Sequence, residues 1–204
     1  GATTSTPGMC PCGPVSSLRW PVRSSNWRAD GELEPDLVQA GVVGISDIDT
    51  RALTRHLRDR GAMRVGVFSG DALADEDAML RRVLDSPGMT GADLTADVTT
   101  AKPYVVEPEG DVRYTVAAVD LGIKAMTPHR MAQRGVRVIV LPATSSLSDL
   151  TGTDADGYFL SNGPGDPATA DHTVSLVEGL LAADQPLFGI CFGNQMLGRA
   201  LGLD

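Results

Sequence analysis

The sequence predicts an α/β protein, with a partial small N-terminal α/β domain followed by a doubly wound, mostly parallel sheet. Two observations lead to this fold class. From about residue 113 onward, short apolar runs alternate with amphipathic segments, and two glycine-rich turns each follow an apolar run. With 204 residues, of which 42% are hydrophobic, the chain is long enough to bury a sizeable core in one large domain or two small ones.

The charge of the chain limits its partners. It carries 26 acidic and 17 basic side chains, a formal net charge of −9, and no basic stripe. Nucleic acid and anionic membrane surfaces are therefore poor partners. No run approaches the roughly 20 apolar residues of a membrane span, and the first residues lack a signal-peptide pattern. We expect a cytoplasmic protein that acts on small molecules or proteins.

The first half of the chain is predicted to contain an irregular, unassigned segment over residues 1–24 and a small domain over residues 25–105. In this domain Asp49 is a candidate N-cap and Gly61 a stop for an amphipathic helix. The run "AMRVGVF" that follows is a strand candidate, and "LADEDAMLRRVLDSPG" predicts a second helix. Residues 41–90 are therefore expected to form a small α/β unit.

The second domain is predicted to span residues 113–204, after the proline-marked connector "TTAKPYVVEPEGD". Its expected strands are "YTVAAVD", "VRVIVLP", "GYFL" and "PLFGI", and helices are expected over residues 124–134 and in "ADHTVSLVEGLLAAD". Ligands of such sheets bind at the carboxyl ends of the strands. The two glycine turns, residues 162–166 and 189–193, follow two of these ends.

Cys191 lies at the centre of "GICFG", which has the spacing of a nucleophile elbow with cysteine in place of serine. Gly189 and Gly193 permit a sharp turn from strand to helix, and a helix N-terminus favours the thiolate. The backbone N–H of Phe192 could then face an oxyanion. The alternative is a small buried structural thiol, since free cysteine is among the most buried residue types.

The second turn, "SNGPGDP", places Gly163 and Gly165 on either side of a proline, so that backbone N–H groups can face a ligand. An ordinary strand-to-loop turn is the alternative. No Gly-Lys-Ser/Thr follows and no nucleotide fingerprint occurs elsewhere. Cys10-Pro11-Cys12, without further ligands at metal-site spacing, indicates incidental thiols rather than a metal site.

Taken together, "VDLGIK", "SNGPGDP" and "FGICFGNQ" resemble the triad glutamine amidotransferase domain. The segment "GISDIDTRALTRHLRDRGAMR" resembles, more specifically, the small glutamine-hydrolysing subunit family of carbamoyl-phosphate synthetases. The resemblance covers about Ser25 to Asp204. Other amidotransferases share the cysteine elbow but lack the Asp-Thr-Arg-Ala-Leu-Thr helix.

The resemblance implies that Cys191 attacks the glutamine carboxamide, forms a glutamyl thioester and releases ammonia. Phe192 and Gly163 would supply oxyanion N–H groups, and Gln195 and Gly165 would hold L-glutamine. Ammonia would pass to a large synthetase subunit. That partner would carry the ATP and Mg, so no cofactor is expected in this chain. Whether the carbamoyl phosphate serves pyrimidine or arginine biosynthesis is left open by the resemblance.

The chain also departs from this family. Members place a catalytic His and its Glu partner in a His-Pro-Glu segment well after the elbow, whereas this chain stops at Asp204. A serine loop near the family's N-terminus is missing too, and residues 1–24 do not resemble the family. We therefore expect a fragment truncated at both ends and inactive as written, with the amidotransferase domain incomplete at its C-terminus. The three histidines are expected to be polar surface or capping residues: His56, His129 and His172.

Two other functions are considered. One is a non-catalytic module that binds glutamine or the large subunit, which the missing histidine favours. The other is the glutaminase partner of another synthase, such as anthranilate synthase; the unit over residues 41–68, which those glutaminases lack, argues against it.

Overall fold

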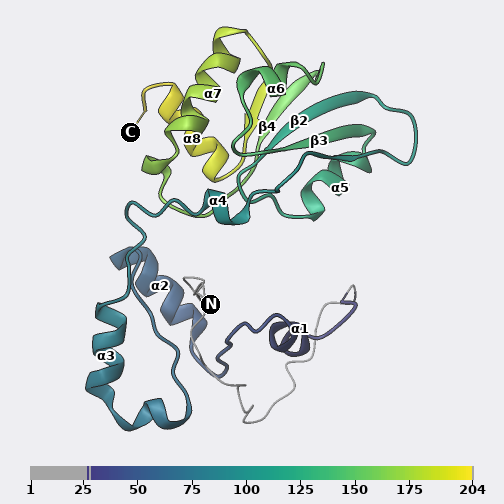
Figure 1. Cartoon of the computed structure of the whole chain (residues 1–204). Coiled ribbons are helices and arrows are strands. Elements are labelled where there is room, and N and C mark those ends of the chain that lie inside the picture. Colours follow the sequence, from purple (N-terminus) through teal and green to yellow (C-terminus); the bar gives the residue numbers. More distant parts are fainter. Residues whose placement is uncertain (1–26, 28, 204) are drawn as a thin grey trace, which may run out of the picture. The chain divides into compact units, whose positions relative to one another are not determined.

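The computed structural model describes residues 27 and 29–203. The chain divides into two compact units, Gly1–Pro87 (unit 1) and Gly88–Asp204 (unit 2) (Figure 1). The predicted boundaries near residues 24, 105 and 113 stay predictions. Among the described residues no helix has both the length and the apolar character needed to cross a bilayer.

Unit 1 consists of short helices in its described part: α1 (Leu33–Gln39), α2 (Thr50–Arg60), the 3₁₀ helix η1 (Gly70–Ala74) and α3 (Glu76–Leu84). The two predicted helices, α2 and α3, are confirmed. The Asp49 carboxylate accepts the backbone N–H of Ala52 at 2.8 Å, and α2 ends at Gly61, whose φ is 86°. Residues with Cβ rarely adopt that conformation, so the sequence itself sets both ends of this helix.

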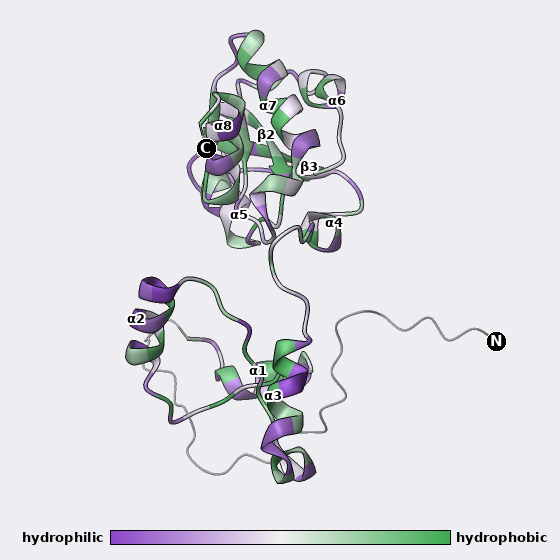
Figure 2. Ribbon diagram, turned by 90° about the vertical axis from the view of Figure 1, so that its left-hand side faces the viewer, coloured by the Kyte–Doolittle hydropathy of each residue, from purple (hydrophilic) through white to green (hydrophobic). Residues whose placement is uncertain are grey.

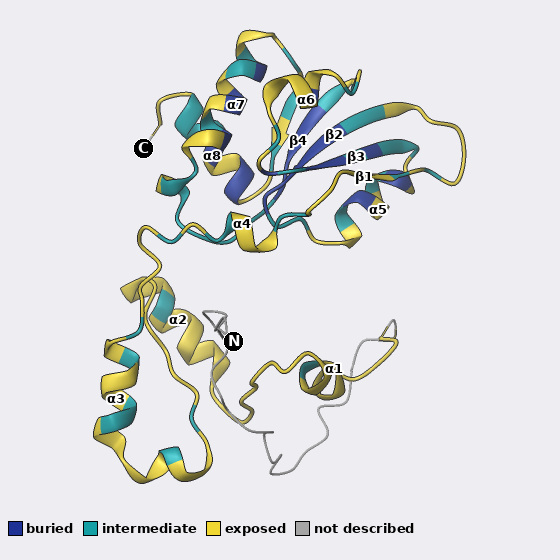
Figure 3. Cartoon of the chain, viewed as in Figure 1, coloured by how far each residue is buried: buried dark blue, intermediate teal, exposed yellow. Residues whose placement is uncertain are grey.

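The strand predicted for residues 62–68 is wrong, because the described part of unit 1 contains no strand. Apolar alternation is not sufficient for a strand, whose backbone N–H and C=O groups need a neighbouring strand. Val65 is 65% exposed and Val67 is 39% exposed, so neither side chain enters a core. Figure 2 shows apolar residues in α1 and α3, yet Figure 3 shows most of both helices exposed.

Unit 2 contains a five-stranded sheet in the order β1-β3-β2-β4-β5. Only β1 is antiparallel to its neighbour, and the other three pairings are parallel. The strands are β1 (Tyr104–Val106), β2 (Tyr114–Asp120), β3 (Val136–Pro142), β4 (Gly157–Leu160) and β5 (Leu187–Gly189). The four predicted strands are confirmed. Strand β1 lies in the segment that we expected to be a connector.

Helices cover both faces of this sheet, as the doubly wound prediction requires (Figure 1). The α-helices of unit 2 are α4 (Thr95–Val98), α5 (Met126–Ala132), α6 (Leu147–Thr151), α7 (Asp171–Ala182) and α8 (Phe192–Ala200), and η2 (Pro167–Thr169) is a 3₁₀ helix. The predicted helices α5 and α7 are confirmed, whereas α4 and α6 were not predicted.

Two apolar clusters form the core of unit 2, one on each face of the sheet. Ala117 and Val119 of β2 pack with apolar side chains of α6, α7 and α8. Ala118, between them, faces the other way and packs with Phe159 and with Met131 of α5. Fully burying one large apolar side chain stabilises the fold by about 1.5–3 kcal/mol. These clusters therefore fix the strand ends from which the candidate site is built.

Candidate active site

The turn around Cys191 has the geometry of a nucleophile elbow. Cys191 joins β5 to α8 with φ 52° and ψ −112°, a conformation that costs a non-glycine residue on the order of 1–3 kcal/mol. A Cβ on Gly189 would lie 2.6 Å from the backbone of Gly193, and a Cβ on Gly193 would overlap the carbonyl oxygen of Leu160. Both glycines are therefore required. The Cys191 thiol is free and exposed, which excludes the alternative of a buried structural thiol.

The first turn of α8 carries two further predicted site residues. Phe192 is buried in the core cluster that α8 shares with the sheet, so its side chain anchors the elbow while its backbone stays at the helix N-terminus. Gln195 is exposed, and its backbone N–H donates to the carbonyl oxygen of Cys191 at 3.0 Å. Cys191 and Gln195 thus lie one helical turn apart.

The glycine turn after β4 lies beside the elbow, because β4 and β5 are parallel neighbours whose carboxyl ends meet at the same edge of the sheet. A Cβ on Gly163 would overlap the carbonyl oxygen of Leu121, at the end of β2. Gly165 has φ +102°, and a Cβ there would lie 2.8 Å from the carbonyl oxygen of Ala92. The structure therefore brings together the two turns that the sequence singled out.

Ser161 connects these pieces, and sequence reasoning did not identify it. Its fully buried hydroxyl accepts the backbone N–H of Leu121 at 2.9 Å, and its carbonyl oxygen accepts the N–H of Gly193 at 3.1 Å. The side chain of Asn162 donates to the carbonyl oxygen of Gly122 at 2.8 Å. These bonds join the ends of β2 and β4 to the elbow. A polar residue directly after a buried strand was the available signal.

Asp166 ends the glycine turn and was also not identified from the sequence. Its carboxylate accepts the backbone N–H groups of Gly91, at 2.7 Å, and of Ala168, at 2.9 Å. These two bonds lower the pKa of Asp166 below its ordinary value, and the bond from Gly91 makes the larger contribution. The Arg199 guanidinium lowers this pKa further. The carboxylate is thus ionised at neutral pH.

No hydrogen bond joins His129 or His172, the two histidines of unit 2, to the thiol. His129 is exposed on α5, which packs on the face of the sheet opposite to α8. The Nε2 atom of His172 lies 3.1 Å from the carbonyl oxygen of Ser145. His56 lies on α2 of unit 1. Among the described residues no group of three or more His, Cys, Asp or Glu side chains could hold a metal ion. Cys10 and Cys12 lie outside the described residues.

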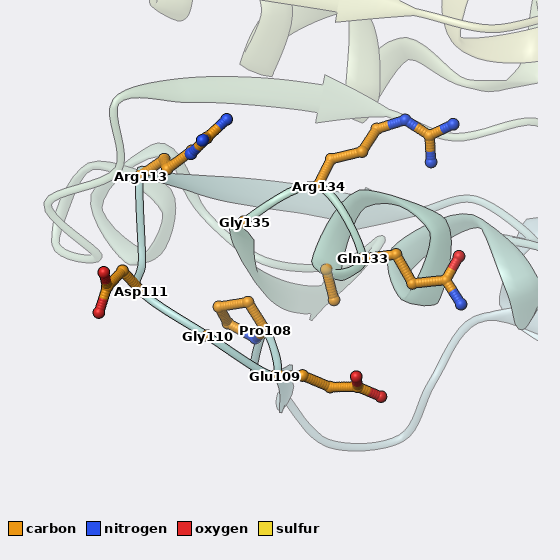
Figure 4. Close-up of a pocket in the computed structure, with 9 residues that line it drawn as sticks. Pro108, Glu109, Gly110, Asp111, Arg113, Gln133, Arg134 and Gly135 are labelled. Carbon is orange, nitrogen blue, oxygen red and sulfur yellow. The ribbon is translucent and has the colours of Figure 1, made fainter.

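A hollow of about 350 Å³ lies elsewhere in unit 2 (Figure 4). It is lined by Pro108–Asp111 and by Gln133–Gly135, which precede β2 and β3. The hollow is therefore at the amino edge of the sheet, whereas the two glycine turns are at the carboxyl edge. The charged side chains that line it are of both signs: Glu109 and Asp111 are acidic, and Arg113 and Arg134 are basic (Figure 4). The chemistry of Cys191 favours the carboxyl edge as the candidate site.

The family comparisons define the class to which this site belongs. Residues 117–204 match the family model described as glutamine amidotransferase class-I. The match contains both glycine turns and Cys191. Unit 2 therefore contains a class-I glutamine amidotransferase domain, in agreement with its mostly parallel sheet.

The particular relatives are small chains of carbamoyl phosphate synthase, and the predicted resemblance is confirmed. Residues 15–67 match the model "Carbamoyl-phosphate synthase small chain, CPSase domain". This match begins before Ser25, so our expectation that residues 1–24 do not resemble the family is wrong for residues 15–24.

Three relatives named carbamoyl phosphate synthase small chain illustrate the similarity. The chain of Streptomyces coelicolor is 63% identical over 186 residues, 91% of this chain and 49% of the relative. That of Mycobacterium tuberculosis is 57% identical over 184 residues, 89% of this chain and 49% of the relative. That of Bifidobacterium longum is 52% identical over 191 residues, 87% of this chain and 47% of the relative. The chain thus spans about half the length of these relatives.

Proposed function

We propose that the chain is part of a glutamine-hydrolysing small subunit of carbamoyl phosphate synthase, a cytoplasmic enzyme. The observation that carries the proposal is the exposed Cys191 on a strained elbow beside the Gly163–Gly165 turn. The strain supports a function, since a positive φ at a non-glycine residue persists only where the surrounding structure enforces it.

In the proposed reaction the Cys191 thiolate attacks the carboxamide carbon of L-glutamine. A C–S bond forms, and the carbonyl oxygen becomes an oxyanion that accepts the backbone N–H groups of Phe192 and Gly163. The C–N bond then breaks, and the nitrogen takes a proton and leaves as ammonia. Water hydrolyses the thioester to glutamate and restores the thiol. Gln195 and Gly165 hold the substrate in this scheme.

Ammonia would pass to a large subunit that uses ATP and Mg to make carbamoyl phosphate from bicarbonate. This chain would need no cofactor of its own. The relatives' names support this partner, because a small chain implies a large one. We expect the protein that contains this chain to co-purify with a large ATP-dependent synthetase, and its recovery only as a free monomer would contradict the proposal.

The 204-residue chain by itself is expected to release glutamate slowly. Departure of ammonia needs a proton donor and thioester hydrolysis needs a base, yet neither His129 nor His172 is hydrogen-bonded to Cys191. General acid–base catalysis contributes about 10²–10⁴-fold, so turnover should fall below that of a complete amidotransferase by that factor. Rapid turnover that is lost in Cys191→Ser would show that another residue of the chain serves as the base.

The test of the site is covalent labelling by a glutamine-shaped electrophile, such as a chloromethyl ketone analogue of L-glutamine, read by mass spectrometry. Cys191 should be labelled faster than Cys10 or Cys12, and L-glutamine should protect it. Equal labelling of the three thiols without protection would favour a non-catalytic binding module. This second function would then rest on the similarity of residues 15–67 to the small-chain domain.

A further inference from the structure

The segment that directly follows unit 1 is bonded to the glycine turn of the candidate site. We call Gly91–Leu94 the strap. The Gly91 N–H donates to Asp166 Oδ2 at 2.7 Å, and the Asp166 N–H donates to the Ala92 carbonyl oxygen at 2.9 Å. The two bonds form a closed pair, and the first of them joins residues 75 positions apart in the sequence.

The backbone of the strap also lies in close contact with Gly165. A Cβ at Gly165 would lie 2.8 Å from the Ala92 carbonyl oxygen and 3.2 Å from the Leu94 nitrogen. The backbone of the strap is thus in close contact with the backbone of the turn. The position of Gly165 therefore depends on where the strap lies.

The end of the same segment is attached to the sheet. The Thr100 N–H donates to Asp120 Oδ2 at 2.8 Å, at the end of β2. The Thr99 hydroxyl accepts the N–H of Ala143, which follows β3, at 2.8 Å. The segment over residues 91–100 is therefore bonded to the ends of β2 and β3 and to the turn that follows β4, all at the carboxyl edge of the sheet.

The helix that begins after Cys191 is bonded to the residues that follow the same turn. Arg199 of α8 donates through Nη1 to the Pro167 carbonyl oxygen at 2.6 Å, and through Nη2 to Asp171 Oδ1 at 2.9 Å. Asp166 thus lies between the strap and Pro167, whose carbonyl oxygen is bonded to Arg199 of α8. Its carboxylate bonds the strap on one side and the Ala168 N–H of the turn's own continuation on the other.

We infer that Asp166 is a positioning residue, which holds the strap against the glycine turn and so sets the distance of Gly163 and Gly165 from Cys191. Its carboxylate accepts hydrogen bonds from the backbone N–H groups of Gly91 and Ala168, and none from Cys191. This inference rests on the proposed function, because it assigns Asp166 the task of placing the groups that would bind glutamine.

The experiment compares two reagents on Cys191 of the 204-residue chain. Iodoacetamide reports the reactivity of the thiol itself, and the chloromethyl ketone analogue of L-glutamine also needs a correctly placed glycine turn. The quantity measured is the ratio of the two labelling rate constants. Asp166→Ala should lower this ratio about tenfold, the size expected for losing hydrogen bonds to a charged acceptor, with little change in the iodoacetamide rate.

A matched control is Asp156→Ala. The Asp156 carboxylate also accepts a backbone N–H from a distant residue, Thr115, at the same distance of 2.7 Å, but it does so at the amino edge of the sheet. This variant should keep the wild-type ratio. If Asp166→Ala does not fold, Asp166→Asn carries the test, since its single amide oxygen can replace only one of the two carboxylate acceptors.

The outcomes separate the two proposals. A wild-type chain that shows no preference for the L-glutamine analogue over its D-enantiomer would overturn the glutamine site and this inference with it. If Asp166→Ala and Asp166→Asn keep the wild-type ratio of the two labelling rate constants, only the positioning role is overturned. An equal loss in Asp156→Ala and Asp166→Ala would also overturn it, because general destabilisation would then explain both.

Discussion

The two units of this chain differ in what stabilises them. Among the residues that the structure describes, all the buried hydrophobic ones lie in unit 2, between Ala117 and Met196, and none in unit 1 is buried (Figure 3). The helices α2 and α3 nevertheless have well-formed caps at Asp49 and Asp75. Local sequence signals such as caps therefore suffice to define a helix. Burial of its apolar side chains requires packing against other elements, and in the described part of unit 1 no side chain is buried in this way.

The two units also differ in the sequence separation of the residues that their side-chain hydrogen bonds join. In unit 1 the side-chain bonds at Asp49 and Asp75 are local, with the guanidinium of Arg64 reaching the Leu84 carbonyl oxygen at 2.6 Å. In unit 2 Asp156, Ser161 and Asp166 each join residues at least 40 positions apart, whereas 20 positions separate Arg64 from Leu84. We infer that unit 2 unfolds cooperatively and that the described helices of unit 1 open locally.

The largest effect is expected from a matched pair of phenylalanines. Phe159 is 2% exposed in the core of unit 2, so Phe159→Ala should lower the free energy of unfolding of that unit by about 3–5 kcal/mol. Phe68 of unit 1 is only partly buried, and the Arg82 guanidinium lies 5.2 Å from its ring. Phe68→Ala should cost about 1 kcal/mol or less.

Urea denaturation followed by circular dichroism measures both changes. Equal costs for the two phenylalanines would show that unit 1 has a core comparable with that of unit 2, and the comparison between the units would then fail.

A smaller effect is expected at the helix caps. Asp75→Ala removes the acceptor of the Ala78 N–H at 2.8 Å and should destabilise α3 by about 1 kcal/mol. Because the loss is local, the helical signal should fall while the urea midpoint of unit 2 stays unchanged. Glu76→Ala, in the first turn of the same helix, serves as the control for a lost acidic side chain. A shift of the unit 2 midpoint in Asp75→Ala would reveal coupling between the units.

The smallest effect concerns pH at α6, in unit 2. The hydrogen bonds from the Ser146 hydroxyl and backbone N–H lower the pKa of the Asp149 carboxyl. A carboxyl whose folded pKa is depressed contributes stability above its ordinary value of about 3.9 and loses it as pH falls through the folded value. Carboxyl chemical shifts in an NMR titration should place the Asp149 midpoint below about 3.9.

The variant Ser146→Ala should move that midpoint upward, because it removes the hydroxyl that makes the largest contribution. An unchanged Asp149 midpoint in Ser146→Ala would count against the capping box as the cause.

The sequence by itself determined the elements whose signals are local. The buried strands β2 and β3 have continuous apolar runs, α2 has its cap and its glycine stop, and the elbow needs Gly189 and Gly193 because of backbone sterics alone. The spacing around Cys191 therefore predicted a strand-to-helix turn, and the alternation of strands and helices predicted that both glycine turns lie at one edge of the sheet.

Only the tertiary structure decided the features that depend on a partner distant in the sequence. The run at residues 62–68 has strand-like alternation and no strand to pair with, whereas Tyr104–Val106 becomes a strand because β3 offers it an edge. The same reason explains Ser161 and Asp166, whose polar side chains look like ordinary turn residues in the sequence. Their tasks appear only where folding brings Leu121 and Gly91 within hydrogen-bonding distance, since a hydrogen bond between distant residues leaves no periodic pattern in the chain.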